Sequence, residues 1–255
     1  MQKFLLTLLL AVIGVTAFAE GDTNRYYWVA FKNKTGTPYK IDRPNEFLSQ
    51  RALFRRQRLH IDIDSIDLPV NPKYVEQVRD KGAKIHNVSK WLNGTTVIAN
   101  DRIVERLKKL DFVAEVVYYS RRAVMVDTTA DHYDAGIQQE RLAYSNLHDT
   151  NYYNLGFSQI AQLNGQPLHT HGFEGQGILV GVCDGGTMVL STLASNVPGV
   201  YVGTAPKATY ALCITEDTHT ESPIEELNWV SAAEYLDSLG VDVINSSLGY
   251  LGFDD

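Results

Sequence analysis

Residues 177–186 have the sequence GILVGVCDGG and decide the architecture of the C-terminal half of the chain. An unbroken apolar run that ends on the carboxylate of Asp184 is typical of a strand buried on both faces of a parallel sheet. Two further apolar runs, 208–214 and 241–245, follow along the chain, with helical patterns between the three runs. Strands that alternate with helices predict an α/β fold, a parallel sheet with helices on both faces.

The helices between these strands have recognisable ends. Residues 222–225, Ser-Pro-Ile-Glu, form a capping-box sequence with proline at the first helical position, and Gly240 marks the stop. A shorter helix is expected at 188–196. In an open parallel sheet, binding and catalytic groups gather at the carboxyl ends of the strands, which points to Asp184 and to 245–249, NSSLG. The alternative for Asp184 is a purely structural role, in which the aspartate caps the following helix.

The N-terminal half has a different organisation. Its patterns predict the order β-α-α-β-β-α-β, which is sufficient for a small α+β domain over residues 20–125. The expected elements are a strand at 26–31, a basic amphipathic helix within 44–59, a helix at 74–81 stopped by Gly82, a strand pair within 84–99 turning at Asn93-Gly94, a helix from Asp101, its expected cap, to Leu110, and a strand at 112–119. No cluster of side chains in this half suggests chemistry.

Two segments lie outside these domains. Residues 1–19 combine Lys3, an apolar run at 4–15 and the sequence AFA at 17–19, which predicts a secretory signal peptide and hence a secreted or periplasmic protein. Nothing later in the sequence has the roughly 20 apolar residues that a membrane span needs. Residues 126–155 are polar without a periodic pattern and are expected to form an exposed linker before the α/β domain at 156–255.

Charge separates the two halves more sharply than the net value of −7 suggests. Residues 20–125 carry 20 basic and 13 acidic side chains, a net charge of +7, whereas residues 126–255 carry 2 and 17, a net charge of −15. Such an acidic half argues against nucleic acid as a partner. We expect the basic and acidic halves to attract each other instead.

Four segments of the C-terminal half, taken in order, resemble the subtilisin-like serine proteases of peptidase family S8. The segment at 175–186, GQGILVGVCDGG, resembles the aspartate motif of that family, and TMVLS at 187–191 resembles the helix after its His-Gly-Thr motif. The segment VGTAPKA at 202–208 resembles its G-x-A-P-x-A strand, and DVINSSLG at 242–249 resembles its substrate-cleft segment. The N-terminal half looks like the inhibitory propeptide that these secreted enzymes carry.

The resemblance implies a serine endopeptidase that hydrolyses peptide bonds with an Asp-His-Ser triad and without a cofactor. Only Asp184 matches a triad position, where the aspartate orients the histidine. Ser247, Leu248 and Gly249 match the segment whose backbone binds an extended peptide or protein substrate. The propeptide half would dock on the catalytic half.

The departures from the family pattern concern the rest of the triad. Gly185 stands where the histidine belongs, so that two family segments look joined across an internal deletion, and the sequence stops before the family's nucleophilic serine. We therefore expect little or no proteolysis from this chain. Two alternatives remain open: a propeptide-type inhibitor or folding chaperone that acts in trans, and a remnant without function.

Other candidate side chains favour structural explanations. His169 and His171 precede the strand of Asp184, so neither is expected to replace the missing histidine. Cys183 is expected to face away from Asp184, because neighbouring strand residues alternate. Buried free thiols are favoured for Cys183 and Cys213, with a disulfide as the alternative. Acidic residues at 62–67 suggest calcium only weakly, because an EF-hand glycine and glutamate are missing; no metal site is expected, and a solvated edge is favoured.

Overall fold

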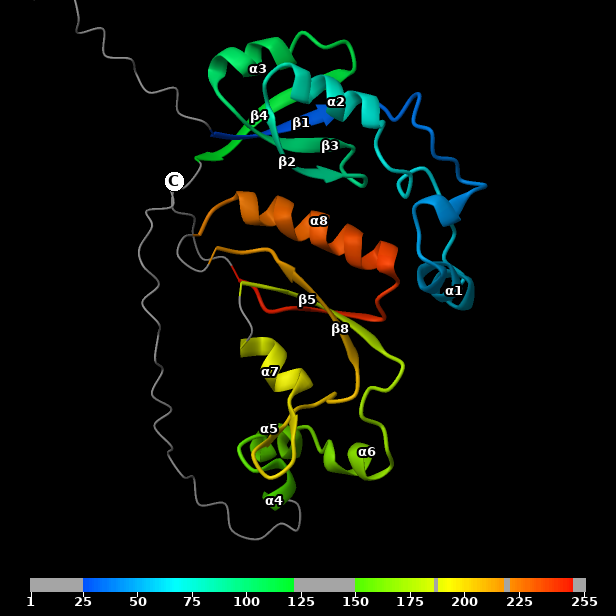
Figure 1. The fold of residues 1–255 in the computed structure, drawn as a ribbon, viewed down its shortest axis with the longest axis vertical. Helices are drawn as coiled ribbons and strands as arrows, with labels where there is room; N and C mark the ends of the chain where they lie inside the picture. The colour runs from blue at the N-terminus through cyan, green and yellow to red at the C-terminus, as the bar shows by residue number, and fades with distance from the viewer. Residues whose placement is uncertain (1–24, 122–149, 186–187, 218–220, 250–255) are drawn as a thin grey trace, which may run out of the picture.

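The computed structural model describes residues 25–121, 150–185, 188–217 and 221–249 (Figure 1). They form an N-terminal domain (25–121) and an α/β domain (150–249), each built on its own sheet. Helix α8 (Ile224–Leu239) of the α/β domain lies between the two sheets. The predicted signal peptide and residues 126–149 of the predicted linker lie outside the described residues.

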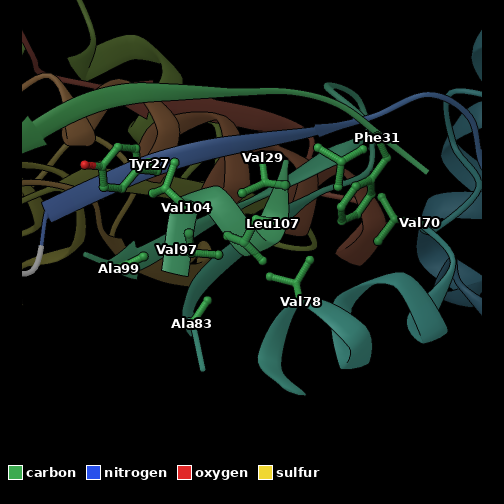
Figure 2. Close-up of a cluster of buried hydrophobic side chains, with 11 residues drawn as sticks. Tyr27, Val29, Phe31, Val70, Val78, Ala83, Val97, Ala99, Val104 and Leu107 are labelled. Atoms are coloured by element: carbon green, nitrogen blue, oxygen red, sulfur yellow. The ribbon is translucent and has the colours of Figure 1, made fainter. Parts of the chain in front are cut away.

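The N-terminal domain is an antiparallel sheet with two helices on one face. Its strands are β1 (Arg25–Phe31), β2 (Lys84–Ser89), β3 (Gly94–Ala99) and β4 (Val113–Arg121), in the order β2-β3-β1-β4. Helices α2 (Pro72–Asp80) and α3 (Asp101–Leu107) cover it, and Val78 and Leu107 pack against strand residues such as Val29 and Val97 (Figure 2). The core also contains Tyr27, Phe31, Val70, Ala83, Ala99, Val104 and Val113. The predicted β-α-α-β-β-α-β order is therefore confirmed.

The segment between β1 and α2 leaves this sheet and carries the basic helix. The predicted helix within 44–59 is divided into a short 3-10 helix, η1 (Pro44–Glu46), and α1 (Gln50–Leu59). The division occurs because the hydroxyl of Ser49 accepts a hydrogen bond from the amide of Ala52 and so starts a new helix. The prediction that Asp101 caps α3 is wrong by one residue, since Asn100 Oδ1 accepts from the amide of Ile103 at 2.9 Å.

The α/β domain is organised around a parallel sheet of three strands. These are β5 (Leu179–Asp184), β8 (Thr209–Ile214) and β9 (Val243–Ser246), with β5 in the centre. Leu236 of α8 is fully buried and packs with Cys183 and Val241 against one face of this sheet. A Cβ at Gly181 would lie 2.6 Å from Leu236 Cδ1 and force this side chain to shift, so a glycine lets α8 pack closely on the central strand.

Small elements fill the rest of this domain. Helices α4 (Thr150–Tyr153), α5 (Phe157–Gln162) and α6 (Gln166–Thr170) precede β5, while α7 (Met188–Ala194), β6 (Asn196–Val197) and β7 (Tyr201–Val202) lie between β5 and β8. A second core joins Tyr153, Phe157 and Ile160 to Val202. The predicted linker, 126–155, therefore includes helix α4, so expecting an exposed connection was wrong for its last residues.

Two sequence predictions about this domain differ from the structure. The capping box does not form, because the carboxylate of Glu225 accepts from the amide of Asp217 at 3.1 Å and α8 has no side-chain cap. The far face of the sheet is incompletely covered, since Leu212 and Ile214 point away from α8 and are 54% and 84% exposed. Among the described helices, none combines the length and apolar character that crossing a bilayer requires.

Candidate functional site

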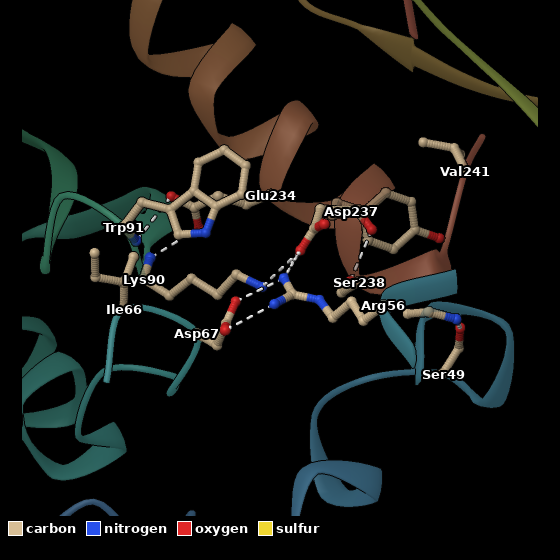
Figure 3. A network of polar contacts seen from close by, with 12 residues as sticks. Ser49, Arg56, Ile66, Asp67, Lys90, Trp91, Glu234, Asp237, Ser238 and Val241 are labelled. Carbon is tan, nitrogen blue, oxygen red and sulfur yellow. Dashed lines mark hydrogen bonds and ion pairs between the residues drawn. The ribbon is translucent and has the colours of Figure 1, made fainter. Parts of the chain in front are cut away.

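The surface between the two domains gathers most of the buried charged groups. Its centre is Glu234 on α8, which is only 5% exposed. The Glu234 carboxylate accepts hydrogen bonds from Ser89 Oγ at 2.5 Å and from the amides of Lys90 and Trp91 at 2.8 and 3.1 Å (Figure 3). Three donors from the β2–β3 turn thus converge on one carboxylate, which compensates for its removal from water.

A second set of polar contacts lies toward the N-terminal end of α8. Asn228 Oδ1 is 2.8 Å from His86 Nε2 and accepts from Asn87 Nδ2 at 3.2 Å. At the opposite edge of the same sheet, the hydroxyl of Tyr119 donates to Glu226 at 3.0 Å. Burial, together with this carboxylate, raises the pKa of Tyr119 to about 12, so the phenol is a fixed donor. Polar side chains of the N-terminal sheet therefore contact α8 along most of the length of the helix.

Arg56 forms the ionic centre at the other end of α8. Its guanidinium makes two parallel hydrogen bonds to Asp67 of its own domain, at 2.9 and 2.7 Å, and a third to Asp237 Oδ2 of α8 at 2.7 Å (Figure 3). Arg56 is 6% exposed and Asp67 5% exposed, so both are withdrawn from solvent. Because Asp67 already orients the guanidinium, the N-terminal domain presents a preorganised cation to α8.

The acidic partners of this interface are held in their charged form. Burial by itself would raise the pKa of Asp237, but the hydrogen bonds and charges of Arg56 and Arg55 outweigh it and keep the pKa below its ordinary value. Asp242 shows the same balance: burial opposes ionisation, yet the amide of Leu179 and the guanidinium of Arg51 lower its pKa. At this interface the side chains of Asp237 and Asp242 are therefore ionised carboxylates and not neutral carboxylic acids.

Comparison with known proteins identifies the N-terminal domain. Residues 26–134 match the family described as Peptidase S8 propeptide domain, Bacteroidota. The N-terminal domain is therefore similar to peptidase S8 propeptide domains, and we call it the propeptide domain. A comparison with curated proteins gives no match. The surface described above is therefore the face that a propeptide domain presents to the α/β domain that follows it in the chain.

The propeptide domain supplies the positive charges of the interface, and α8 and the residues between α8 and β9 supply the negative ones. Sequence analysis predicted attraction between a basic and an acidic half, and the paired residues show where that attraction acts. It did not single out Glu234, Asp237 or Asp242, because the charge sums give no positions. The only sequence feature that pointed to the position of this interface was the basic run at 51–58.

The residues predicted to act on a substrate lie at the carboxyl edge of the second sheet. Asp184 is the last residue of β5 and is partly buried. Cys183 pairs in parallel register with Ser246 of β9, so Ser247, the next residue, follows β9 at the edge where Asp184 ends β5. Ser247 and Gly249 are exposed and Leu248 is partly buried. Parallel pairing therefore places the aspartate and the predicted cleft segment at the same sheet edge.

The other candidate side chains have structural partners. His169 is hydrogen-bonded to the hydroxyl of Tyr153 at 2.9 Å and to the carbonyl of Thr204 at 3.0 Å. These contacts connect α4 and α6 to the segment that follows β7. His171 is exposed. Cys183 and Cys213 are free thiols in adjacent registered strands, and burial raises the pKa of Cys183 to about 11.

Of the acidic residues at 62–67, Asp62 and Asp64 are exposed as expected, whereas Asp67 is buried. Asp67 is buried against Arg56, and it also accepts from the amide of Asp64, whose own carboxylate accepts from the amide of Ile66. Expecting a solvated edge was therefore wrong for Asp67. Within the described residues, no group of three or more His, Cys, Asp or Glu side chains is arranged to hold a metal ion.

Proposed function

We propose that this chain belongs to a secreted or periplasmic subtilisin-like serine endopeptidase, with a propeptide domain docked on the α/β domain that carries the family's aspartate. The observation that carries the proposal is the contact of α8 with the propeptide sheet, centred on the buried carboxylate of Glu234 and its three donors. A propeptide domain that satisfies buried charges of the following domain is suited to hold that domain folded and closed.

In this proposal Asp184 is the orienting member of an Asp-His-Ser triad. Its carboxylate would accept the Nδ1 proton of a histidine and stabilise the imidazolium that forms when the serine is deprotonated. The backbone of Ser247, Leu248 and Gly249 would pair with an extended peptide as an added strand, which aligns the scissile bond. No cofactor takes part in this chemistry.

Gly185 stands where the family's histidine belongs after Asp184, so we propose that this chain itself is catalytically silent. A serine-directed fluorophosphonate should leave the purified full chain unlabelled, while a subtilisin-type protease in the same tube reacts. Labelling of one serine in this chain at a comparable rate would overturn the proposed inactivity. Loss of the triad serine or histidine alone lowers turnover by about 10⁶ in a studied member of this family.

Docking is tested by cutting the chain between the two halves. A protease recognition sequence inserted within 126–149 allows cleavage, after which the halves should still co-elute on size exclusion. Glu234→Ala should release them, because Ser89 Oγ and two backbone amides then lose a buried acceptor. Lys108→Ala, which removes an exposed pair with Glu105, is the matched control. Halves that separate in the unaltered cut chain would contradict the proposed docking.

A second function is supported by the self-contained core of the propeptide domain. Its eleven buried apolar residues and its Arg56–Asp67 pair belong to one domain, so the binding face exists before a partner arrives. Such a domain can inhibit, or assist the folding of, an intact subtilisin-type protease in trans. Residues 20–125 alone should then inhibit such a protease slowly and tightly, whereas no inhibition at micromolar concentration would reject this function.

A further inference from the structure

The α1 segment, residues 43–67, contacts the C-terminal end of α8 at a place that the propeptide sheet does not reach. Ser49 donates its amide to the carbonyl of Ser238 at 2.9 Å and its hydroxyl to the carbonyl of Leu239 at 2.8 Å. The same hydroxyl accepts from Ala52 and so also caps α1. One serine therefore begins one helix and completes the end of another.

Arginines of α1 continue this pattern beyond the helix end. Arg51 Nε donates to the carbonyl of Gly240 at 3.0 Å, and Arg55 Nη1 donates to the carbonyl of Val241 at 2.7 Å. Four successive carbonyls, 238–241, thus receive donors from the α1 segment. Carbonyls at a helix end have no partner within the helix, so these donors complete the last turn of α8 from the other domain.

Carboxylates on both sides of this corner are paired with the same arginines. Arg55 forms an ion pair with Asp237, and Arg51 with Asp242. Asp237 lies in the last turn of α8, where the helix dipole disfavours a negative charge, and that turn contains no basic residue of its own. The end of α8 is therefore unfavourable by itself and is compensated by α1.

The backbones also meet closely at this corner. Gly240 has a φ of 82°, and a Cβ placed on it would lie 2.4 Å from the backbone nitrogen of Ala52. Ala52 is completely buried. Only a glycine at the helix end allows α1 to reach these carbonyls, so shape and charge select the same sequence, DSLGVD at 237–242.

We propose that the α1 segment is a second docking element that recognises an acidic helix end of the form Asp-x-x-Gly-x-Asp and so determines which catalytic domain the propeptide domain accepts. This inference rests on the proposed docking of the propeptide domain. Its partner is defined by chemistry: a helix that ends at glycine, with one carboxylate in its last turn and another two residues after the glycine.

The test uses the full chain cut within 126–149 and measures the dissociation constant of its two halves. Arg51→Ala and Arg55→Ala should each weaken binding by about 30-fold or more, since each leaves a carboxylate of the partner with fewer donors. Arg58→Ala is the matched control on the same helix. The Arg58 side chain is 58% exposed, and its 3.6 Å distance to Asp242 is longer than a hydrogen bond. This substitution should change the dissociation constant by less than about threefold. Asp237→Asn and Asp242→Asn should weaken binding as the arginine variants do.

Amide hydrogen exchange in the uncut chain provides the second measurement. The amides of Gly240, Val241 and Asp242 donate hydrogen bonds within the α/β domain. In the arginine variants these amides should exchange faster, while the amides of Lys90 and Trp91, which donate to Glu234, stay protected. If Glu234→Ala releases the halves but both arginine variants bind normally, α1 is not a docking element and the proposed function stands. If the unaltered halves do not bind at all, both proposals fail.

Discussion

Replacing Arg56 by methionine removes the guanidinium but keeps most of the volume of its stem. Arg56 is 6% exposed and holds two carboxylates at once, Asp67 through two hydrogen bonds and Asp237 through one. The substitution leaves Asp67 with the amide of Asp64 as donor and Asp237 with Arg55. Removing one member of a buried ion pair costs about 3–5 kcal/mol, because the remaining charge stays buried.

The opposite substitution is expected to cost much less. Asp237→Asn leaves Arg56 paired with Asp67 and keeps an oxygen to which Arg55 can still donate, so the loss should be about 1–2 kcal/mol. Arg43→Met is the exposed control: Arg43 contacts Glu46 at 2.8 Å but is 48% exposed, so its cost should stay below about 1 kcal/mol.

Urea unfolding of the full chain measures these differences. At an unchanged slope with urea, a loss of stability moves the midpoint to lower denaturant. We expect Arg56→Met to lower the midpoint most, Asp237→Asn less and Arg43→Met least. A midpoint for Arg56→Met at or above that of Asp237→Asn would falsify the asymmetry, since the shared arginine would then not be the centre of the network.

Three further predictions concern pH, packing and thiol reactivity. Because the folded chain holds the pKa values of Asp237 and Asp242 below the ordinary 3.8, their stabilisation is complete above that pH and is lost as the pH falls below it; urea midpoints between about pH 5 and pH 2 should fall more for the parent chain than for the double asparagine variant. Leu236→Ala should cost about 2–5 kcal/mol in urea unfolding, because this side chain is fully buried between α8 and the sheet, and a loss below 1 kcal/mol would show that the site collapses or is not packed. Cys183, buried and with a pKa raised to about 11, should react with iodoacetamide at pH 8 at least about tenfold faster in urea than in the native chain, and equal rates would contradict its burial.

Patterns that depend on neighbouring residues were predictable from the sequence. Alternation and turn residues located β1 and the β2–β3 pair, and Gly240 marked the end of α8. The exact caps were less predictable, because Asn100 and Asp101 are both good N-cap residues and only the backbone geometry selects one. Ser49 likewise divides a basic run that has a helical pattern throughout.

Contacts between the domains could not be predicted from the sequence at the level of residues. An acidic side chain in a helix is usually solvated, and only the packing of α8 between two sheets buries Glu234 and partly buries Asp237. Glu225 shows the same limit, because the capping-box pattern is present and its carboxylate is used by Asp217 instead. The position of Asp184 beside the 247–249 segment was predictable, because parallel strands end at the same edge of a sheet. The burial of Asp67 was not predicted, because its partner, Arg56, is eleven residues away in the chain.

Ser49 and Leu239, which share a hydrogen bond at the end of α8, are 190 residues apart in the chain. During synthesis, the ribosome releases the strands and helices of residues 25–121 long before it reaches α8, and domains tend to fold in the order in which they emerge. Residues 43–67 are therefore already synthesised when the DSLGVD corner at 237–242 is made. The order of synthesis thus makes the α1 donors available before the helix end that they bind.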